Sequence, residues 1–156
     1  MRSDFAICQE LITESTDESL GQLMDLLLDK FSAERGCLWV EAMGKVIYRG
    51  DPELKMTYPF SRQVVLAAVR TRVGLVSFDV GEDDRFQPTE SIMATQIRSC
   101  LCAPARNAEG VTLAVIYFDD KTTRGNFSRE HLEFLIAIMA EFPGAVSWAE
   151  DAPPKI

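Results

Sequence analysis

The sequence predicts an α+β domain with a central antiparallel sheet of five to six strands. Two pairs of neighbouring apolar segments are each joined by a tight turn, which is typical of β-hairpins and therefore of antiparallel strands. Segments near both ends of the chain carry apolar residues at helical spacing, so helices are expected to cover one face of the sheet. A chain of 156 residues has the length of one domain.

Both ends of the domain are predicted to be helical. Residues 1–32 divide into a short amphipathic helix and a second helix whose apolar stripe runs from Leu20 to Phe31. One of the polar residues at 15–17 is expected to cap the second helix. A C-terminal helix is predicted over 128–149, with Ser128 as its N-cap. Pro143 removes a backbone donor and is expected to kink or end that helix.

The sheet and the elements that cover its second face are predicted within residues 35–127. The first hairpin turns at Gly44-Lys45 and the second at 107–110. Asp119 and Asp120 are assigned to the loop after the last strand. The elements expected between the two hairpins are a helix at 61–72, a short strand at 75–78, a polar loop at 79–88 and a short helical segment at 91–95.

The composition excludes several classes of protein. The hydrophobic fraction is 47% and the charged fraction 26%, which is ordinary for a globular domain. The net charge of −8 disfavours direct binding of nucleic acid, because an acidic surface repels phosphate. No apolar run approaches the roughly 20 residues that a membrane span needs. The N-terminus lacks the apolar core of a signal peptide, so we expect a cytoplasmic protein with reduced cysteines.

Few residues suggest catalysis or metal binding. Cys100 and Cys102 are predicted to point to the same side of a strand, as a redox pair or half of a metal site would. A structural zinc site needs four ligands, and His131 is the single histidine, expected on a helix surface. We therefore interpret both thiols as small buried hydrophobes. The sequence indicates no metal site, no cofactor and no catalytic set.

The acidic loop and three aromatic residues could each serve either a binding function or an ordinary structural role. The acidic loop at 79–90 lacks the spacing of a calcium loop, so a solvated loop with Arg85 paired locally is preferred over a cation site. Such a loop also suits a pocket lid. Trp39, Tyr48 and Tyr117 are candidates for stacking on a planar ligand, although aromatic residues on strands are more often core.

Several local sequences, in this order and spacing, resemble the GAF domain family over nearly the whole chain. The resemblance is closest to GAF domains of bacterial signalling proteins and of activators that work with sigma-54 RNA polymerase. The matching segments are Glu34-Arg35-Gly36-Cys37-Leu38, Phe60-Ser61, Phe78-Asp79, Asp84-Arg85-Phe86, Ile97-Arg98-Ser99, Val115-Ile116-Tyr117-Phe118-Asp119 and Gly125-Asn126-Phe127-Ser128.

This resemblance implies a single domain over 1–150, followed by a tail or linker at 151–156. It also implies a ligand pocket on the sheet face opposite the terminal helices, roofed by short helices and loops. The family's terminal helices often form a dimer, and the family's members usually signal to an attached output domain. The residues placed near the pocket by this resemblance are Cys37, Trp39, Tyr48, Val65, Phe78, Met93, Ile97 and Tyr117.

The resemblance does not extend to the specialised branches of the family. The cyclic-nucleotide-binding branch has an Asn-Lys pair where this chain has Asp119-Asp120-Lys121, and an acidic pair where it has His131-Leu132. No cysteine matches the chromophore-attachment site of the bilin-binding branch.

The leading hypothesis is a sensory module that binds a small molecule or a partner domain, in bacterial signal transduction or transcription control. One alternative is a degenerate GAF domain that serves dimerisation or protein contacts alone. Another is a cysteine-dependent free methionine sulfoxide reductase, which needs an accessible thiolate and a resolving cysteine.

Overall fold

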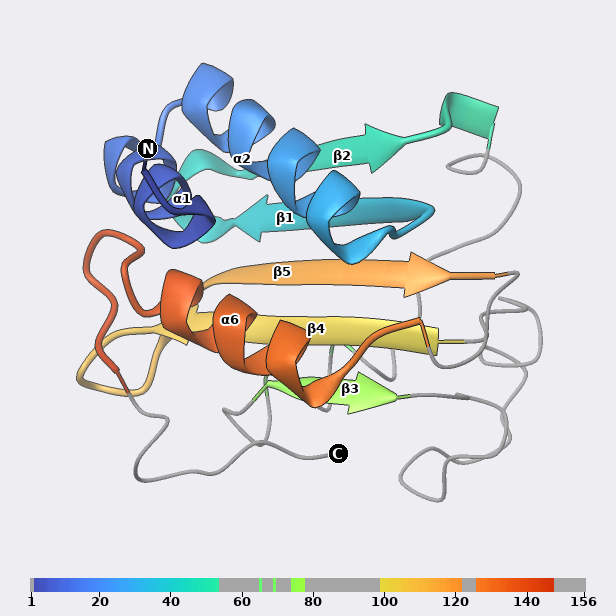
Figure 1. Cartoon of the computed structure of the whole chain (residues 1–156). Coiled ribbons are helices and arrows are strands. Elements are labelled where there is room, and N and C mark those ends of the chain that lie inside the picture. The colour runs from blue at the N-terminus through green and yellow to red at the C-terminus, as the bar shows by residue number, and fades with distance from the viewer. Residues whose placement is uncertain are drawn as a thin grey trace.

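The computed structural model describes residues 2–53, 65, 69, 74–77, 99–121 and 126–147. Three helices and five strands have both of their ends within these ranges (Figure 1). The helices are α1 (Asp4–Glu14), α2 (Asp17–Phe31) and α6 (Arg129–Met139), and a 3-10 turn, η1, spans Glu41–Met43. The strands are β1 (Arg35–Val40), β2 (Lys45–Gly50), β3 (Leu75–Ser77), β4 (Ser99–Arg106) and β5 (Thr112–Asp120).

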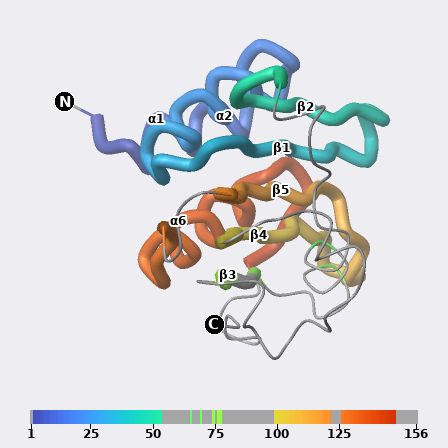
Figure 2. Tube along the Cα trace, turned by 90° about the vertical axis from the view of Figure 1, so that its right-hand side faces the viewer, coloured from blue at the N-terminus to red at the C-terminus, as the bar shows by residue number. Residues whose placement is uncertain are grey.

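The strands form one sheet in the order β2-β1-β5-β4-β3, and every neighbouring pair is antiparallel. The side view keeps this order from β2 down to β3 (Figure 2). The two hairpins lie side by side, because the first strand of one pairs with the second strand of the other. The predicted α+β class and antiparallel sheet are confirmed.

Local side-chain caps explain where the helices begin. Ser3 accepts a hydrogen bond from the Ala6 N–H at the start of α1. Thr16 and Ser19 form a capping box at the start of α2, and Ser128 with its third helical residue does the same for α6. Each cap satisfies backbone N–H groups that the first turn leaves unpaired. Both predicted caps, at 15–17 and at Ser128, are therefore confirmed.

The hydrophobic core lies between the helices and one face of the sheet, as predicted. α2 packs against β1 and β2, α6 packs against β3 and β4, and α1 contacts α2 and α6 (Figure 1). Fully buried side chains from both layers meet there, and the T-shaped contact of Phe31 with Phe118 at 5.2 Å joins α2 to β5. Burial of this apolar area supplies most of the favourable free energy of folding.

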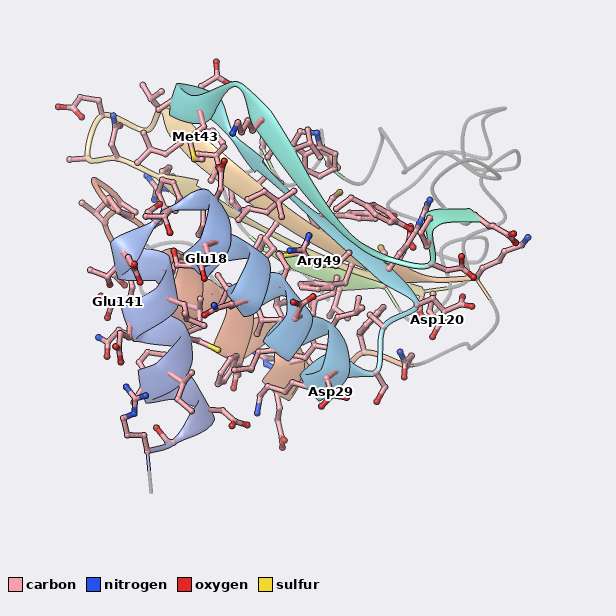
Figure 3. The ribbon with its side chains drawn as sticks, turned by 90° about the horizontal axis from the view of Figure 1, so that it is seen from above. Glu18, Asp29, Met43, Arg49, Asp120 and Glu141 are labelled. Carbon is pink, nitrogen blue, oxygen red and sulfur yellow. The ribbon has the colours of Figure 1, made fainter. Side chains whose placement is uncertain are left out.

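Arg49 ties α2 to the edge strand β2. Its Nε lies 2.8 Å from a carboxylate oxygen of Asp25, and its Nη1 donates to the carbonyl oxygen of Tyr48. Figure 3 shows the Arg49 side chain between the strand and the helix. A Cβ atom at Gly21 would lie 2.4 Å from Nη2 of Arg49. The guanidinium can therefore occupy this position only because residue 21 has no side chain.

The C-terminal helix is shorter than predicted. α6 ends at Met139 with Ala140 as its C-cap, whereas a helix over 128–149 was expected. The chain then makes turns in which the N–H groups of Glu141 and Phe142 bond to carbonyls three residues earlier. The helix thus ends ahead of Pro143, which is consistent with the cost of proline inside a helix.

No helix among the described residues is both long enough and apolar enough to cross a membrane.

Candidate functional site

Four of the predicted pocket residues lie together on the sheet face that points away from the helices. Cys37 of β1 pairs with Tyr48 of β2 on one side and with Tyr117 of β5 on the other. Directly paired residues point to the same face, and so does Trp39, two positions along β1. We call Cys37, Trp39, Tyr48 and Tyr117 the aromatic face.

The aromatic face surrounds a small side chain with three large ones. Cys37 and Tyr117 are fully buried, whereas Trp39 and Tyr48 are half-buried. The rings of Trp39 and Tyr117 meet edge to face, with 6.4 Å between their centroids and 70° between their planes. The partly exposed rings of Trp39 and Tyr48 offer flat apolar surface, which suits stacking against a planar ligand.

Both tyrosine hydroxyls of the aromatic face are hydrogen-bonded. Tyr48 Oη donates to the carbonyl oxygen of Asp51 at 2.8 Å, and Tyr117 Oη donates to Oδ2 of Asp119 at 2.8 Å. Burial raises the pKa of Tyr48 above its ordinary value of 10.0. Burial, together with the neighbouring Asp119 carboxylate, raises the pKa of Tyr117 well above that value. Both phenols therefore stay protonated at neutral pH.

A buried ion pair lies beside the aromatic face. Arg35 grips the Asp119 carboxylate in a bidentate manner, with Nε 2.8 Å from Oδ1 and Nη2 2.9 Å from Oδ2. Both side chains are fully buried. A buried charge is tolerated only when it is paired and hydrogen-bonded, and Tyr117 adds a third donor to this carboxylate. The Arg35–Asp119–Tyr117 network therefore fixes one wall of the candidate site without adding net charge.

The sequence places Asp119 and Asp120 in a loop, and this assignment is wrong. Both belong to the end of β5 and both are buried. No local signal marked them as strand residues, because two acidic residues directly follow the apolar run and have no apolar–polar alternation. The role of Arg35 was also missed, because the residues of this pair are separated by 84 positions.

Three of the four cysteines lie on the same face of the sheet as the aromatic residues. Cys100 pairs across the strands with Asp119, and Cys102 pairs with Tyr117, next to Cys37. All four are free thiols and all are buried, so the predicted burial of Cys100 and Cys102 is confirmed. Burial raises the pKa of Cys102, which disfavours its thiolate. Cys8 lies among the core residues between the helices and the sheet, and its pKa is raised to about 11, chiefly by burial.

The remaining predicted site residues are placed only in part. Val65 is helical and half-buried. Phe78, Met93 and Ile97 lie outside the described residues, as does the acidic loop at 79–90. Within the described part of the chain, no group of three or more His, Cys, Asp and Glu is arranged to hold a metal ion.

His131 is more buried than the expected surface position. Its Nδ1 accepts the Ser128 N–H at 3.3 Å, so the ring forms half of the capping box of α6. The ring also packs on Phe31, with 4.9 Å between centroids. Burial lowers the pKa of His131 below 6.5, and nearby Lys30 lowers it further while Glu130 opposes the shift. The neutral ring that this favours is the form able to accept a hydrogen bond.

Comparisons with solved structures find the same fold in proteins of different activity. A protein from Burkholderia vietnamiensis described as a GAF sensor matches with a TM-score of 0.66 and 14% identity, over 91% of this chain and 90% of that chain. A type II free methionine-R-sulfoxide reductase from Thermoplasma acidophilum matches with a TM-score of 0.62 and 16% identity, over 93% and 99%. The GAF domain of an Acinetobacter phosphoenolpyruvate-protein phosphotransferase gives 0.58 and 15%, over 97% and 98%.

At these identities the structural matches show a shared fold and leave the activity open. None of the curated proteins matches the sequence. The family model of the GAF domain matches residues 15–143, which is most of the chain and includes the whole aromatic face. The chain therefore belongs to the GAF domain family.

Proposed function

We propose that this GAF domain is a regulatory sensory module that binds a small, flat molecule against the aromatic face and signals to an attached output domain. The observation that carries the proposal is the row Tyr48–Cys37–Tyr117 across three strands, with Trp39 beside it, on the face opposite the helices. Half-exposed Trp39 and Tyr48 provide ring surface, and the paired Arg35 and Asp119 keep the wall free of net charge.

The remaining parts of the proposal concern the setting of the module. Val65, Phe78, Met93 and Ile97 are proposed to contribute to the same pocket. The terminal helices are proposed to form a homodimer, in a bacterial signalling or transcription-control protein that does not itself contact nucleic acid through this domain. The four buried free cysteines are consistent with the reducing cytoplasm.

Native mass spectrometry of the protein purified from its host tests ligand binding directly. A retained molecule adds mass that is lost on denaturation, and the same spectrum reports the monomer or dimer. The variant Cys37→Leu fills the centre of the aromatic face and should abolish the added mass. Cys8→Leu is its matched control, because Cys8 is equally buried but lies among the helix-side core residues. A bare mass in the wild type, with no ligand found by thermal-shift screening, would contradict small-molecule sensing and favour a domain used for protein contacts alone.

A second candidate, a free methionine-R-sulfoxide reductase, is favoured by one observation. Cys37, Cys100 and Cys102 lie on one face around Tyr117, and proteins with this activity share the fold. In that reaction the sulfoxide oxygen leaves as water, while two thiols lose their hydrogens and form a disulfide that an added dithiol reduces. The burial of all three thiols is the argument against it.

An assay of free methionine-R-sulfoxide reduction with dithiothreitol separates the two candidates. Because the reaction uses two thiols, a reductase should lose activity in at least two of the variants Cys37→Ser, Cys100→Ser and Cys102→Ser. It should keep its activity in Cys8→Ser. Wild-type protein with no turnover above the dithiothreitol blank would exclude the reductase.

A further inference from the structure

The C-terminal half of β5 connects the aromatic face to the helix layer through alternate side chains. Tyr117 and Asp119 point to the aromatic face, as their pairing with Cys37 and Arg35 shows. Phe118 and Asp120 point to the other face, where Phe118 belongs to the core beneath the helices. A strand places successive side chains on opposite faces, so one short segment contacts both layers.

On the aromatic face, this segment holds the Arg35–Asp119–Tyr117 network. The Asp119 carboxylate accepts from Arg35 and from the Tyr117 hydroxyl at 2.8–2.9 Å. Arg35 is the first residue of β1 and directly follows the turn after α2. A change in the hydrogen bonds of Tyr117 or Arg35 is therefore expected to move the backbone close to the end of α2.

On the helix face, the same segment holds the end of α2 through Asn126. The amide Nδ2 of Asn126 donates to Oδ2 of Asp120 at 3.0 Å and to the carbonyl oxygens of Phe31 at 3.3 Å and Ser32 at 2.9 Å. The last carbonyls of a helix lack partners within it, so this amide serves as a side-chain cap. Figure 3 shows Asp120 at the same end of the domain as Asp29, in the last turn of α2.

A second bond fixes the turn between α2 and β1 to the residue after β5. The backbone N–H of Lys121 donates to the Glu34 carboxylate. The Phe31 ring adds an apolar contact with Phe118, and it also packs against Phe134 of α6 at 6.3 Å. The end of α2 is thus the place where β1, β5 and α6 meet.

We propose that residues 117–120 of β5 transmit the state of the aromatic face to the C-terminal end of α2. Rearrangement of the Arg35–Asp119–Tyr117 network shifts Asp120, and the shift loosens or tightens the hold of Asn126 on the end of α2. This inference rests on the proposed sensory function and names its route of regulation. The aromatic face and the end of α2 are coupled only if changes at each of them shift the same conformational equilibrium. The test therefore changes one of the two places and measures the effect at the other.

Hydrogen exchange at the end of α2 is the readout. The N–H of Ser32 bonds to the carbonyls of Asp29 and Leu28, and the N–H of Ala33 bonds to Leu28, so their exchange rates report local opening of this end. Tyr117→Phe removes the hydroxyl that binds Asp119. It should speed exchange at 32 and 33 about fivefold or more relative to amides in the middle of α1, which correct for global stability.

Tyr48→Phe is the matched control, because it makes the same chemical change on the same row of the sheet. The Tyr48 hydroxyl donates to the carbonyl oxygen of Asp51, directly after β2, instead of to Asp119. Equal effects of Tyr48→Phe and Tyr117→Phe at 32 and 33 would overturn the proposal. The proposal also fails if Tyr117→Phe has the same effect in an Asn126→Ala background, since that background removes the amide that carries the coupling.

A reverse measurement covers the case in which Tyr117→Phe does not fold. The background for this measurement is Trp148→Phe, so that Trp39 is the single tryptophan and the source of the fluorescence. In that background, Asn126→Ala should change the quenching of Trp39 fluorescence by acrylamide, although Trp39 lies on the opposite face of the sheet. Unchanged quenching would overturn the proposal. None of these measurements needs a ligand, so a ligand screen that finds nothing would refute the sensory function while leaving the coupling result intact.

Discussion

The ion pair between Arg35 and Asp119 has an exposed counterpart in the same protein with the same Nε–Oδ1 distance. Arg35 Nε lies 2.8 Å from Oδ1 of Asp119, and Arg49 Nε lies 2.8 Å from Oδ1 of Asp25. The side chains of the first pair are 0% exposed, whereas those of Arg49 and Asp25 are 37% and 63% exposed. The two pairs therefore differ in burial, and the buried carboxylate also accepts hydrogen bonds from Nη2 of Arg35 and from the Tyr117 hydroxyl.

Asp119→Asn should destabilise the domain far more than Asp25→Asn. Removing one partner of a buried pair leaves an uncompensated charge and costs about 3–5 kcal/mol. Removing one partner of an exposed pair costs about 0–1 kcal/mol, because water solvates both groups. For a chain of this size, the first change corresponds to a fall in Tm of roughly 6–20 °C. Urea unfolding followed by circular dichroism at neutral pH measures both free energies of unfolding.

A third variant allows the reasoning to be tested even if Asp119→Asn does not fold. Arg35→Met with Asp119→Leu replaces the pair by apolar side chains of similar size, and such replacements are often neutral or stabilising. This double variant should be more stable than Asp119→Asn alone. The reasoning is refuted if Asp119→Asn and Asp25→Asn agree within about 1 kcal/mol, because burial would then have no effect on the cost.

Three further predictions follow from other parts of the fold. The lowered pKa of His131 means that the unfolded chain binds a proton more readily than the folded chain; its contribution to stability is present above pH 6.5 and declines as pH falls toward the lower folded value. Urea unfolding at pH 7.5 and 5 should show a smaller acid loss in His131→Gln, which keeps an acceptor for the Ser128 N–H; equal losses would exclude this ring as the cause. Gly50→Ala should destabilise more than Gly44→Ala in the same assay, because both have positive φ but an added Cβ meets backbone 2.6 Å away at 50 and nothing within 4 Å at 44. No cysteine should react with Ellman's reagent at pH 8 in the native protein, because all four are buried and the pKa of Cys8 is about 11. All four should react once the protein is unfolded in roughly 6 M guanidinium. A thiol that reacts quickly in the native protein would contradict this and would favour the reductase.

Local sequence signals were sufficient for most of the elements. Apolar spacing placed the stripe of α2, and the polar residues at Thr16 and Ser128 marked where helices begin. The β4–β5 turn was also visible, because Asn107 accepts two backbone N–H bonds with its side chain and Gly110 takes a positive φ of 83°. These signals are short-range, so they survive without knowledge of the fold.

The candidate site depended on more than local pattern. Strand alternation put Trp39 on the same face as Cys37, but the sequence contains no signal that Tyr48 and Tyr117 would flank Cys37 on either side. The family resemblance predicted only that all three residues lie near the pocket. Val65 is placed only as half-buried and helical, so its part in the site stays a prediction.

By itself, then, the sequence determined the α+β class, the two hairpins, the capped helices and the apolar surfaces that must meet. Only the tertiary structure decided that Asp119 is a strand residue buried against Arg35, and that Asn126 caps the end of α2. The physical reason is that a charged side chain is buried only when a partner is present, and here the partner comes from a distant strand. Short-range pattern assigns such a residue to a loop until the pairing of β1 with β5 brings the two charges together.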